Sequence, residues 1–407
     1  MLSFVQNWLA QRANPIGVDF GSDCLRLAQV QWVGGDHKLI AAASADVPSH
    51  VRHDPQARFA FFIETTRDLL AQGNFRGRQT VLALPASSMH IQHIRMAKMD
   101  EAQTRKALAW EARGKMPIDP SQALMRHMVA GEIYHDQEPK NEVIVMAAAR
   151  EFVNQLLASA SKARLDVIGM NVEPKAVVDC FSHVYRRKAD AETTNCFLDI
   201  GLTASRAMIA RGGNILFART IPVGGSHFNE ATAHALRISA DEAKLLRIQL
   251  AISQPPAEER RQKSEVPLAE AAPAEQPVVV DPMAERNAAV QQACMGPLSR
   301  LTEELDLCRR YYESTFTQNP VDRLVFVGGE ARQRGLCQHI ARELGLAAQL
   351  GDPLVRMGRV SEVGIESGID RRQPQPGWAV AIGLSMGPAQ NEEQTAVAGK
   401  ASADVRV

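Results

Sequence analysis

One local pattern occurs twice in this chain and limits the folds that it can adopt. The apolar residues 16–18 lead into Asp19-Phe20-Gly21-Ser22. Residues 25–32 then alternate between apolar and other side chains. The same order returns in residues 195–203, which include Asp199, Gly201 and Thr203. Alternation with a period of two is typical of a β-strand. The chain is therefore predicted to contain two related units, each with a buried strand, an Asp-x-Gly turn and a returning strand.

An Asp-x-Gly turn of this kind has the groups needed to hold a phosphate. A carboxylate at a strand end supplies the oxygen ligands that Mg²⁺ prefers, and glycine lets backbone N–H groups approach a phosphate. A single such turn is weak evidence, because Asp and Gly end many strands for turn reasons alone. Two turns can clamp a polyphosphate between them. We therefore expect Asp19 and Asp199 to hold a magnesium ion, and Gly21, Ser22, Gly201 and Thr203 to contact phosphate.

A third motif follows in the order that a nucleotide site requires. The apolar stretch 324–327 enters Gly328-Gly329-Glu330. A glycine pair after a buried strand offers flat backbone against which an adenine can lie, although a plain strand-to-helix turn would use the same residues. Two phosphate turns followed by this motif predict ATP bound between two lobes.

The length and the local composition predict how these motifs are distributed. A chain of 407 residues is too long for one ordinary core, so two lobes are expected, over 15–194 and 195–387. Residues 87–165 are predicted to form a small α+β module within the first lobe, with Trp110 packed inward on its helix. An amphipathic or disordered N-terminal segment 1–14 and a disordered tail 388–407 are expected outside these lobes, and a disordered Pro-rich loop 254–283 is expected within the second lobe.

The motifs resemble those of a known superfamily. Their order resembles the phosphate-1, phosphate-2 and adenosine motifs of the actin/Hsp70/sugar-kinase ATPases. The resemblance implies an α/β, actin-like (ribonuclease H-like) two-lobe ATPase fold. The chain is more specifically similar to the FtsA-like PilM family of type IV pilus assembly, because residues 108–118 match that family's WEA…P segment in the inserted module. This similarity covers about 15–387 apart from the Pro-rich loop.

The resemblance adds further residues to the candidate nucleotide site. Gly224 and Gly225 match a conserved glycine pair of the family, and Arg26 stands where its members usually have lysine. Asp241 and Lys244 occupy a segment that is E-x-x-K in relatives and touches the ribose. The implied cofactors are ATP and Mg²⁺. No catalytic residue is identified, and we expect ATP hydrolysis to be weak or absent.

The resemblance also implies a role and a partner. PilM-like proteins are cytoplasmic scaffolds at the inner membrane, where they bind the short cytoplasmic end of a PilN-like membrane protein. The implied groove lies between the module and the first lobe, lined partly by residues 90–96 and 107–116. Lysine plus arginine balances aspartate plus glutamate at 46 each, which does not favour nucleic acid as the partner. A polymer-forming FtsA-like protein, a sugar kinase and a GspL-type secretion protein are the alternatives.

Overall fold

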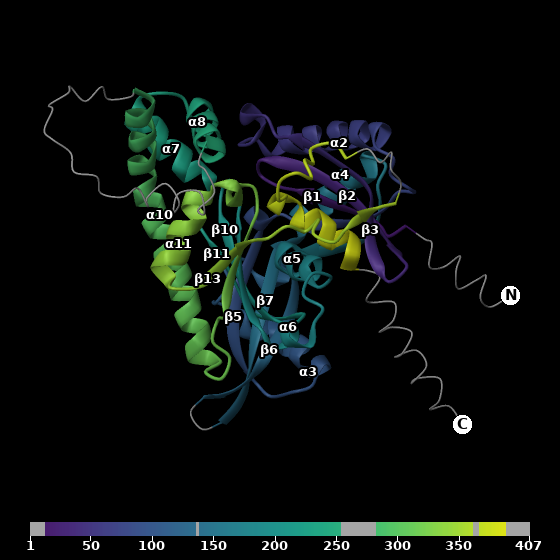
Figure 1. Cartoon of the computed structure of the whole chain (residues 1–407). Coiled ribbons are helices and arrows are strands. Elements are labelled where there is room, and N and C mark those ends of the chain that lie inside the picture. The colour runs from purple at the N-terminus through teal and green to yellow at the C-terminus, as the bar shows by residue number, and fades with distance from the viewer. Residues whose placement is uncertain (1–12, 136–137, 254–281, 361–365, 388–407) are drawn as a thin grey trace, which may run out of the picture.

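The computed structural model describes residues 13–135, 138–253, 282–360 and 366–387. The expectations for the N-terminal segment up to residue 12, for residues 254–281 of the Pro-rich loop and for the tail 388–407 lie outside the described residues. Within them, two lobes stand side by side, each built on its own sheet, and a module extends beneath them (Figure 1). No helix in the described ranges combines the length and the apolar character needed to cross a membrane.

The first lobe contains a six-stranded sheet whose strand order is β14-β3-β2-β1-β4-β8. β1 pairs antiparallel with β2 on one side and parallel with β4 on the other. All five residues of β1 are buried, as expected of a central strand covered on both faces. The strands are β1 (Ile16–Phe20), β2 (Cys24–Val33), β3 (Asp36–Asp46), β4 (Gln79–Leu84), β8 (Asp166–Val172) and β14 (Gly358–Arg359).

The second lobe repeats this core arrangement in a five-stranded sheet, ordered β11-β10-β9-β12-β13. Its central strand β9 pairs antiparallel with β10 and parallel with β12. It therefore has the same two kinds of neighbour as β1. The strands are β9 (Thr194–Ile200), β10 (Ser205–Arg211), β11 (Asn214–Ile221), β12 (Arg323–Val327) and β13 (Ala347–Leu350). The predicted internal repeat is thus present as two sheets of related topology.

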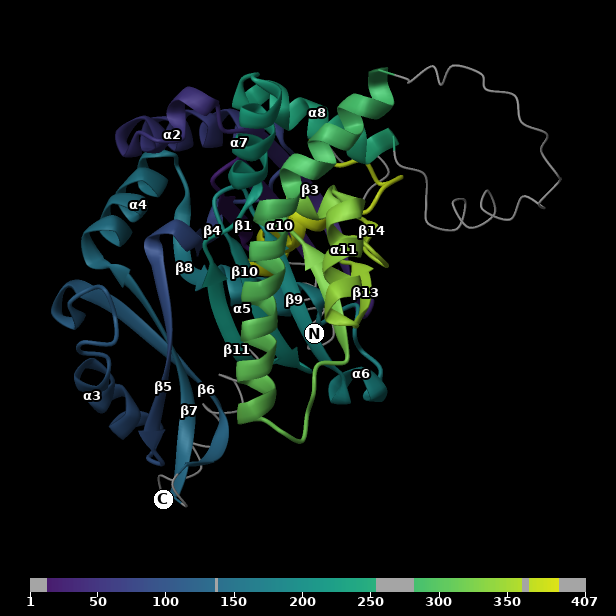
Figure 2. The same ribbon diagram turned by 90° about the vertical axis from the view of Figure 1, so that its left-hand side faces the viewer.

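Helices complete the cores of both lobes. α2 and α4 pack on the first sheet, and α7, α10 and α11 pack with the second (Figure 2). The buried α5 joins the core cluster that contains residues of both sheets. The bounds are α2 (Pro55–Gln72), α4 (Arg150–Lys162), α5 (Glu173–Phe181), α6 (Lys188–Glu192), α7 (Gly225–Leu236), α8 (Ala240–Ser253), α10 (Pro282–Thr315) and α11 (Arg334–Leu344).

The inserted module is a three-stranded antiparallel sheet, ordered β5-β7-β6, with the helix α3 on one face. Its elements are β5 (Met89–Ala97), α3 (Glu101–Glu111), β6 (Ala123–His135) and β7 (Glu138–Ala149). The expected module reached residue 165, but α4 packs in the core of the first lobe. Trp110 was expected to pack inward and instead has 72% of its surface exposed.

After the second sheet the chain returns to the first lobe. β14 pairs with β3, and a helix over 379–387 packs against the start of the chain. Ser385 accepts a hydrogen bond from the Asn14 amide at 2.9 Å and donates one through its hydroxyl to the Pro15 carbonyl at 2.7 Å. The second lobe was expected to run to residue 387, whereas its final helix completes the first lobe.

Candidate functional site

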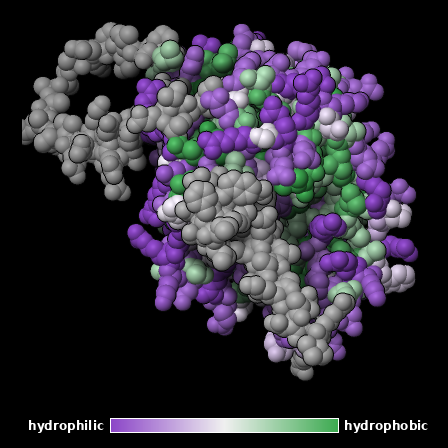
Figure 3. Space-filling model, turned by 90° about the vertical axis from the view of Figure 1, so that its right-hand side faces the viewer, coloured by the Kyte–Doolittle hydropathy of each residue, from purple (hydrophilic) through white to green (hydrophobic). Residues whose placement is uncertain are grey.

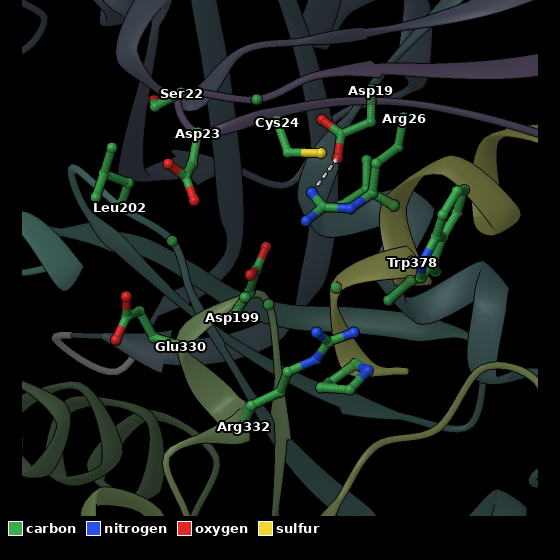
Figure 4. Close-up of a pocket in the computed structure, with 18 of the residues that line it drawn as sticks. Asp19, Ser22, Asp23, Cys24, Arg26, Asp199, Leu202, Glu330, Arg332 and Trp378 are labelled. Atoms are coloured by element: carbon green, nitrogen blue, oxygen red, sulfur yellow. Dashed lines mark ion pairs between the residues drawn. The ribbon is translucent and has the colours of Figure 1, made fainter. Parts of the chain in front are cut away.

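The two repeats face each other across a pocket of about 820 Å³. Both Asp-x-Gly turns and the loop 328–330 contribute to its lining (Figure 4). In each lobe the turn follows the central strand of the sheet, where the antiparallel neighbour begins. The related topology of the two sheets therefore brings the two turns to one place.

The structure places most of the predicted site residues on this pocket. Three of the predicted residues do not line the pocket. Gly224 and Gly225 stand behind the lining, where the Gly225 N–H donates to the Gly201 carbonyl at 2.9 Å. Asp241 lies near the surface, with its side chain 64% exposed. The predicted residues that line the pocket are Asp19, Gly21, Ser22, Arg26, Asp199, Gly201, Thr203, Lys244, Gly328, Gly329 and Glu330.

In the first repeat, Asp19 stands directly across the strand pair from Arg26. The Arg26 Nη1 atom lies 4.0 Å from Asp19 Oδ2. Burial raises the pKa of Asp19 to about 6, against the opposing effect of Arg26, and the negative charge of Asp199 adds to the rise. The two predicted metal ligands are therefore close enough for the charge of Asp199 to act on Asp19.

The second repeat has the same cross-strand pair in a tighter form. Asp199 stands opposite Arg206, which donates two hydrogen bonds to Oδ2, from Nε at 3.1 Å and from Nη2 at 2.7 Å. Glu173, the first residue of α5, places its Oε2 atom 3.1 Å from the same Nε. That contact is an ion pair rather than an aligned hydrogen bond, since the Nε proton is directed at Asp199. Arg206 therefore joins two carboxylates at the bottom of the pocket.

Glu173 and Arg206 were both missed by the sequence analysis. Burial raises the pKa of Glu173 to about 7, although Arg206 opposes the shift. A signal for Arg206 was present, because it follows Asp199 by the same offset at which Arg26 follows Asp19. Glu173 carries a weaker signal as an acidic residue before Pro174 at a helix start, a position that acidic residues favour for reasons unrelated to a ligand.

Polar contacts join the two lobes beside the pocket. Lys244 on α8 donates to both carboxylate oxygens of Asp23, at 2.8 and 2.9 Å. Arg52 donates to the same carboxylate at 2.8 Å, so two cations neutralise Asp23 beside the first Asp-x-Gly turn. The hydroxyls of Ser22 and Thr203 lie 3.1 Å apart, which joins the two turns directly.

The loop after β12 needs glycine for steric reasons. Gly328 has φ of +89°, and a Cβ atom there would lie 2.3 Å from Asp199 Oδ1. A side chain at this position would therefore collide with a predicted metal ligand. Glu330 is held by Arg247 at 2.6 Å, and a Cβ on Gly225 would lie 2.3 Å from its Oε1 atom. The glycine that stands behind the lining thus provides space for Glu330.

Comparison with known families decides the family of the chain. Residues 17–258 match the family model "Type IV pilus assembly protein PilM". The chain belongs to the PilM family. Residues 196–383 of this PilM-family chain also match the model "Cell division protein FtsA". No match was found among curated protein sequences.

This PilM-family chain has the expected actin-like two-lobe fold, as one solved structure confirms. It is similar to the "PilM-PilN type IV pilus biogenesis complex", with a TM-score of 0.69, 22% identity, and coverage of 92% of this chain and 98% of that one. For ethanolamine utilization protein EutJ from Carboxydothermus hydrogenoformans the TM-score is 0.48 at 12% identity, with coverage of 92% of this chain and 89% of that one. For MreB5 of Spiroplasma citri bound to ADP the TM-score is 0.46 at 12% identity, with coverage of 94% of this chain and 98% of that one.

Proposed function

We propose that this PilM-family chain binds ATP with Mg²⁺ between its lobes and acts as an assembly scaffold on the cytoplasmic side of a type IV pilus platform. The observation that supports nucleotide binding is that two Asp-x-Gly turns and a glycine loop, far apart in sequence, line one pocket. Hydroxyls, backbone N–H groups and the cations Arg26 and Lys244 suit a polyphosphate. Hydrolysis is not part of the proposal, because a nucleotide that joins the lobes would use the same contacts.

The carboxylates at the bottom of the pocket fit a hydrated magnesium ion. Mg²⁺ commonly binds proteins through one or two carboxylates and keeps several waters, with further oxygens from phosphate. Asp19 and Asp199 supply two carboxylates from opposite lobes, and Arg206 bonds only the Oδ2 atom of Asp199. The ion would reduce the repulsion between the carboxylates and the phosphates.

Nucleotide binding predicts a thermal shift. ATP with Mg²⁺ is expected to raise the melting temperature of the purified chain, since a ligand that binds only the native state stabilises it. Asp19→Asn removes the charge that would face the metal, so its ATP affinity should fall at least about tenfold, or about 1.4 kcal/mol. Asp36→Asn, which removes an exposed carboxylate paired with Arg186 outside the pocket, is the matched control. Absence of any shift for folded wild-type protein at millimolar ATP would contradict nucleotide binding.

For the scaffold role, we propose a PilN-like partner that docks between the module and the first lobe. β8 is an edge strand of the first sheet, and Ile168 on it is 49% exposed. Leu157 on the neighbouring α4 is 36% exposed, and residues 90–96 lie on β5, an edge strand of the module. Figure 3 shows the face on the right-hand side of Figure 1, where hydrophobic residues gather among hydrophilic ones. Exposed apolar side chains beside open strand edges suit an extended peptide. The chain would then be peripheral to the inner membrane through this partner.

Partner binding can be tested with the peptide of the partner itself. A synthetic cytoplasmic segment of a PilN-like membrane protein is titrated against the full chain by calorimetry. Ile168→Glu places a charge on the proposed docking surface and should weaken binding at least about tenfold, since an uncompensated charge is costly to bury. Leu307→Glu on α10, where the side chain is 46% exposed outside this surface, should leave binding unchanged. Equal affinities for all three proteins would reject this docking surface.

The match to the FtsA model over residues 196–383 supports one alternative, a polymer-forming protein. Sedimentation of the chain with and without ATP separates the two functions. A scaffold should remain in the supernatant without its partner, whereas a filament would pellet when ATP is added.

A further inference from the structure

Arg332 is an exposed cation in the lining of the pocket, and it forms no ion pair with a carboxylate of the described residues. It ends the short helix η4 (Glu330–Arg332), and its Nη2 atom donates at 2.7 Å to Oε1 of Gln375. Four other cations at or beside the pocket do form ion pairs: Arg26 with Asp19, Lys244 with Asp23, Arg206 with Asp199 and Glu173, and Arg247 with Glu330.

The Gln375 side chain holds Arg332 in place without neutralising it. Gln375 is buried, and its amide nitrogen donates to the carbonyls of Asp370 at 2.7 Å and Gln373 at 3.1 Å. With its amide nitrogen fixed in this way, the oxygen is directed at Arg332. The acceptor is neutral, so it sets the orientation of the guanidinium without forming an ion pair. The charge of Asp370 acts on Arg332 from a distance but does not pair with it. A cation that is oriented by a neutral acceptor keeps donors for an anionic ligand.

Arg332 is directed into the pocket from the second lobe, opposite Arg26 from the first. The close-up shows its guanidinium pointing toward the Asp19–Arg26 pair, with Asp199 beside it (Figure 4). Burial lowers the pKa of Arg332, and the positive charge of Arg26 lowers it further. The two like charges are therefore close enough to repel each other, and an anion between them would relieve that repulsion.

We infer that Arg332 is a phosphate-binding residue that, together with Arg26, brackets the terminal phosphate of a bound nucleoside triphosphate. The inference rests on the proposed function and deepens it by assigning a residue to the recognition of that phosphate. The planar guanidinium presents donors in a fork that matches phosphate oxygens. In this arrangement the terminal phosphate lies between Arg26 and Arg332. A diphosphate lacks this group, so Arg332 sets the preference for ATP over ADP.

The test compares affinities for ATP and ADP, both with Mg²⁺, by calorimetry on the full chain. Arg332→Gln should weaken ATP binding about tenfold to a hundredfold, the usual effect of losing a charge-assisted hydrogen bond, and leave ADP binding nearly unchanged. Arg332→Lys keeps the charge without the fork and should lie between the two. Arg342→Gln removes an exposed cation on α11 that does not line this pocket and serves as the control.

The outcomes separate this inference from the proposed function. A fall in the ratio of ATP to ADP affinity for Arg332→Gln, with the ratio intact for Arg342→Gln, supports the role of Arg332. If wild type binds nucleotide and Arg332→Gln has the same ratio of ATP to ADP affinity as wild type, the inference is wrong and the proposed function stands. If folded wild type binds neither nucleotide, both are wrong. Thermal unfolding without nucleotide checks that each variant is folded, and we expect the melting temperature of Arg332→Gln to match that of wild type.

Discussion

Replacing Gly383 by alanine is expected to leave little folded protein. A Cβ atom at this position would lie 1.8 Å from the Ala176 carbonyl oxygen and 2.6 Å from its carbon. Both atoms are backbone of the buried helix α5, so no side chain can rotate away to make room. The helix 379–387 would have to move off α5. The expected loss exceeds about 4 kcal/mol, from a total of only ~5–15 kcal/mol for a typical domain. Soluble yield and the urea midpoint measure it.

Gly387 provides the matched control in the same helix. A Cβ atom at this position would lie 3.6 Å from Asp179 Oδ2, which is an ordinary contact. Gly387→Ala should therefore change the free energy of unfolding by no more than about 1 kcal/mol, the range of helix propensity. A Gly383→Ala protein that unfolds cooperatively at the wild-type midpoint would show that the helix and α5 are not packed this closely.

Arg206→Met is expected to be the most damaging change at the bottom of the pocket. It removes the cation that contacts both Asp199 and Glu173, while Asp19 remains nearby as a third buried carboxylate. Removing one partner of a buried ion pair costs about 3–5 kcal/mol, because the remaining charge is left without compensation. Urea unfolding without nucleotide measures the loss. Arg219→Met breaks a half-exposed pair with Glu304 and should cost less than about 1 kcal/mol.

The pH dependence gives this prediction a definite sign. Burial raises the pKa of Glu173 from 4.5 to about 7 and that of Asp19 from 3.8 to about 6, and Arg206 opposes both shifts. An acid whose pKa is raised on folding contributes stability at low pH that is lost as the pH rises through the folded pKa. Without Arg206 both pKa values rise further, so the deficit should be largest above pH ~7 and should shrink toward pH ~5. A deficit independent of pH, or one that grows in acid, would contradict this account.

The sequence predicted the site where its chemistry depended on local pattern. Asp19 and Asp199 could be found because each closes an apolar strand and precedes a glycine turn, and strand pairing then fixes what lies opposite. Arg206 was within reach of the same reasoning, since its offset from Asp199 repeats that of Arg26 from Asp19. Arg332 could not be found in this way, because its proposed role depends on a contact with Gln375, which is distant in the sequence.

The misplaced elements have equally specific causes. An amphipathic helix shows the same pattern whichever sheet it covers, so nothing in residues 150–162 distinguished packing on the first lobe from packing on the module. Trp110 was expected inward because aromatic residues are usually buried. The inward positions are Thr104 and Leu108 on α3 and Ala112 directly after it, which follow one another at intervals of four. Trp110 stands two residues after Leu108 and therefore points away from the module core.

The return of the last helix to the start of the chain affects the order of folding during synthesis. Five of the six strands in the sheet that contains β1 lie within residues 16–172, whereas the helix 379–387 that covers part of it follows the whole second sheet in the sequence. A nascent chain generally folds its N-terminal parts first as it emerges. Here the second lobe can fold while one face of the first is still open. Native closure of the first lobe must therefore wait until residues 379–387 have left the ribosome, which leaves apolar surface available to chaperones while the second lobe is synthesised.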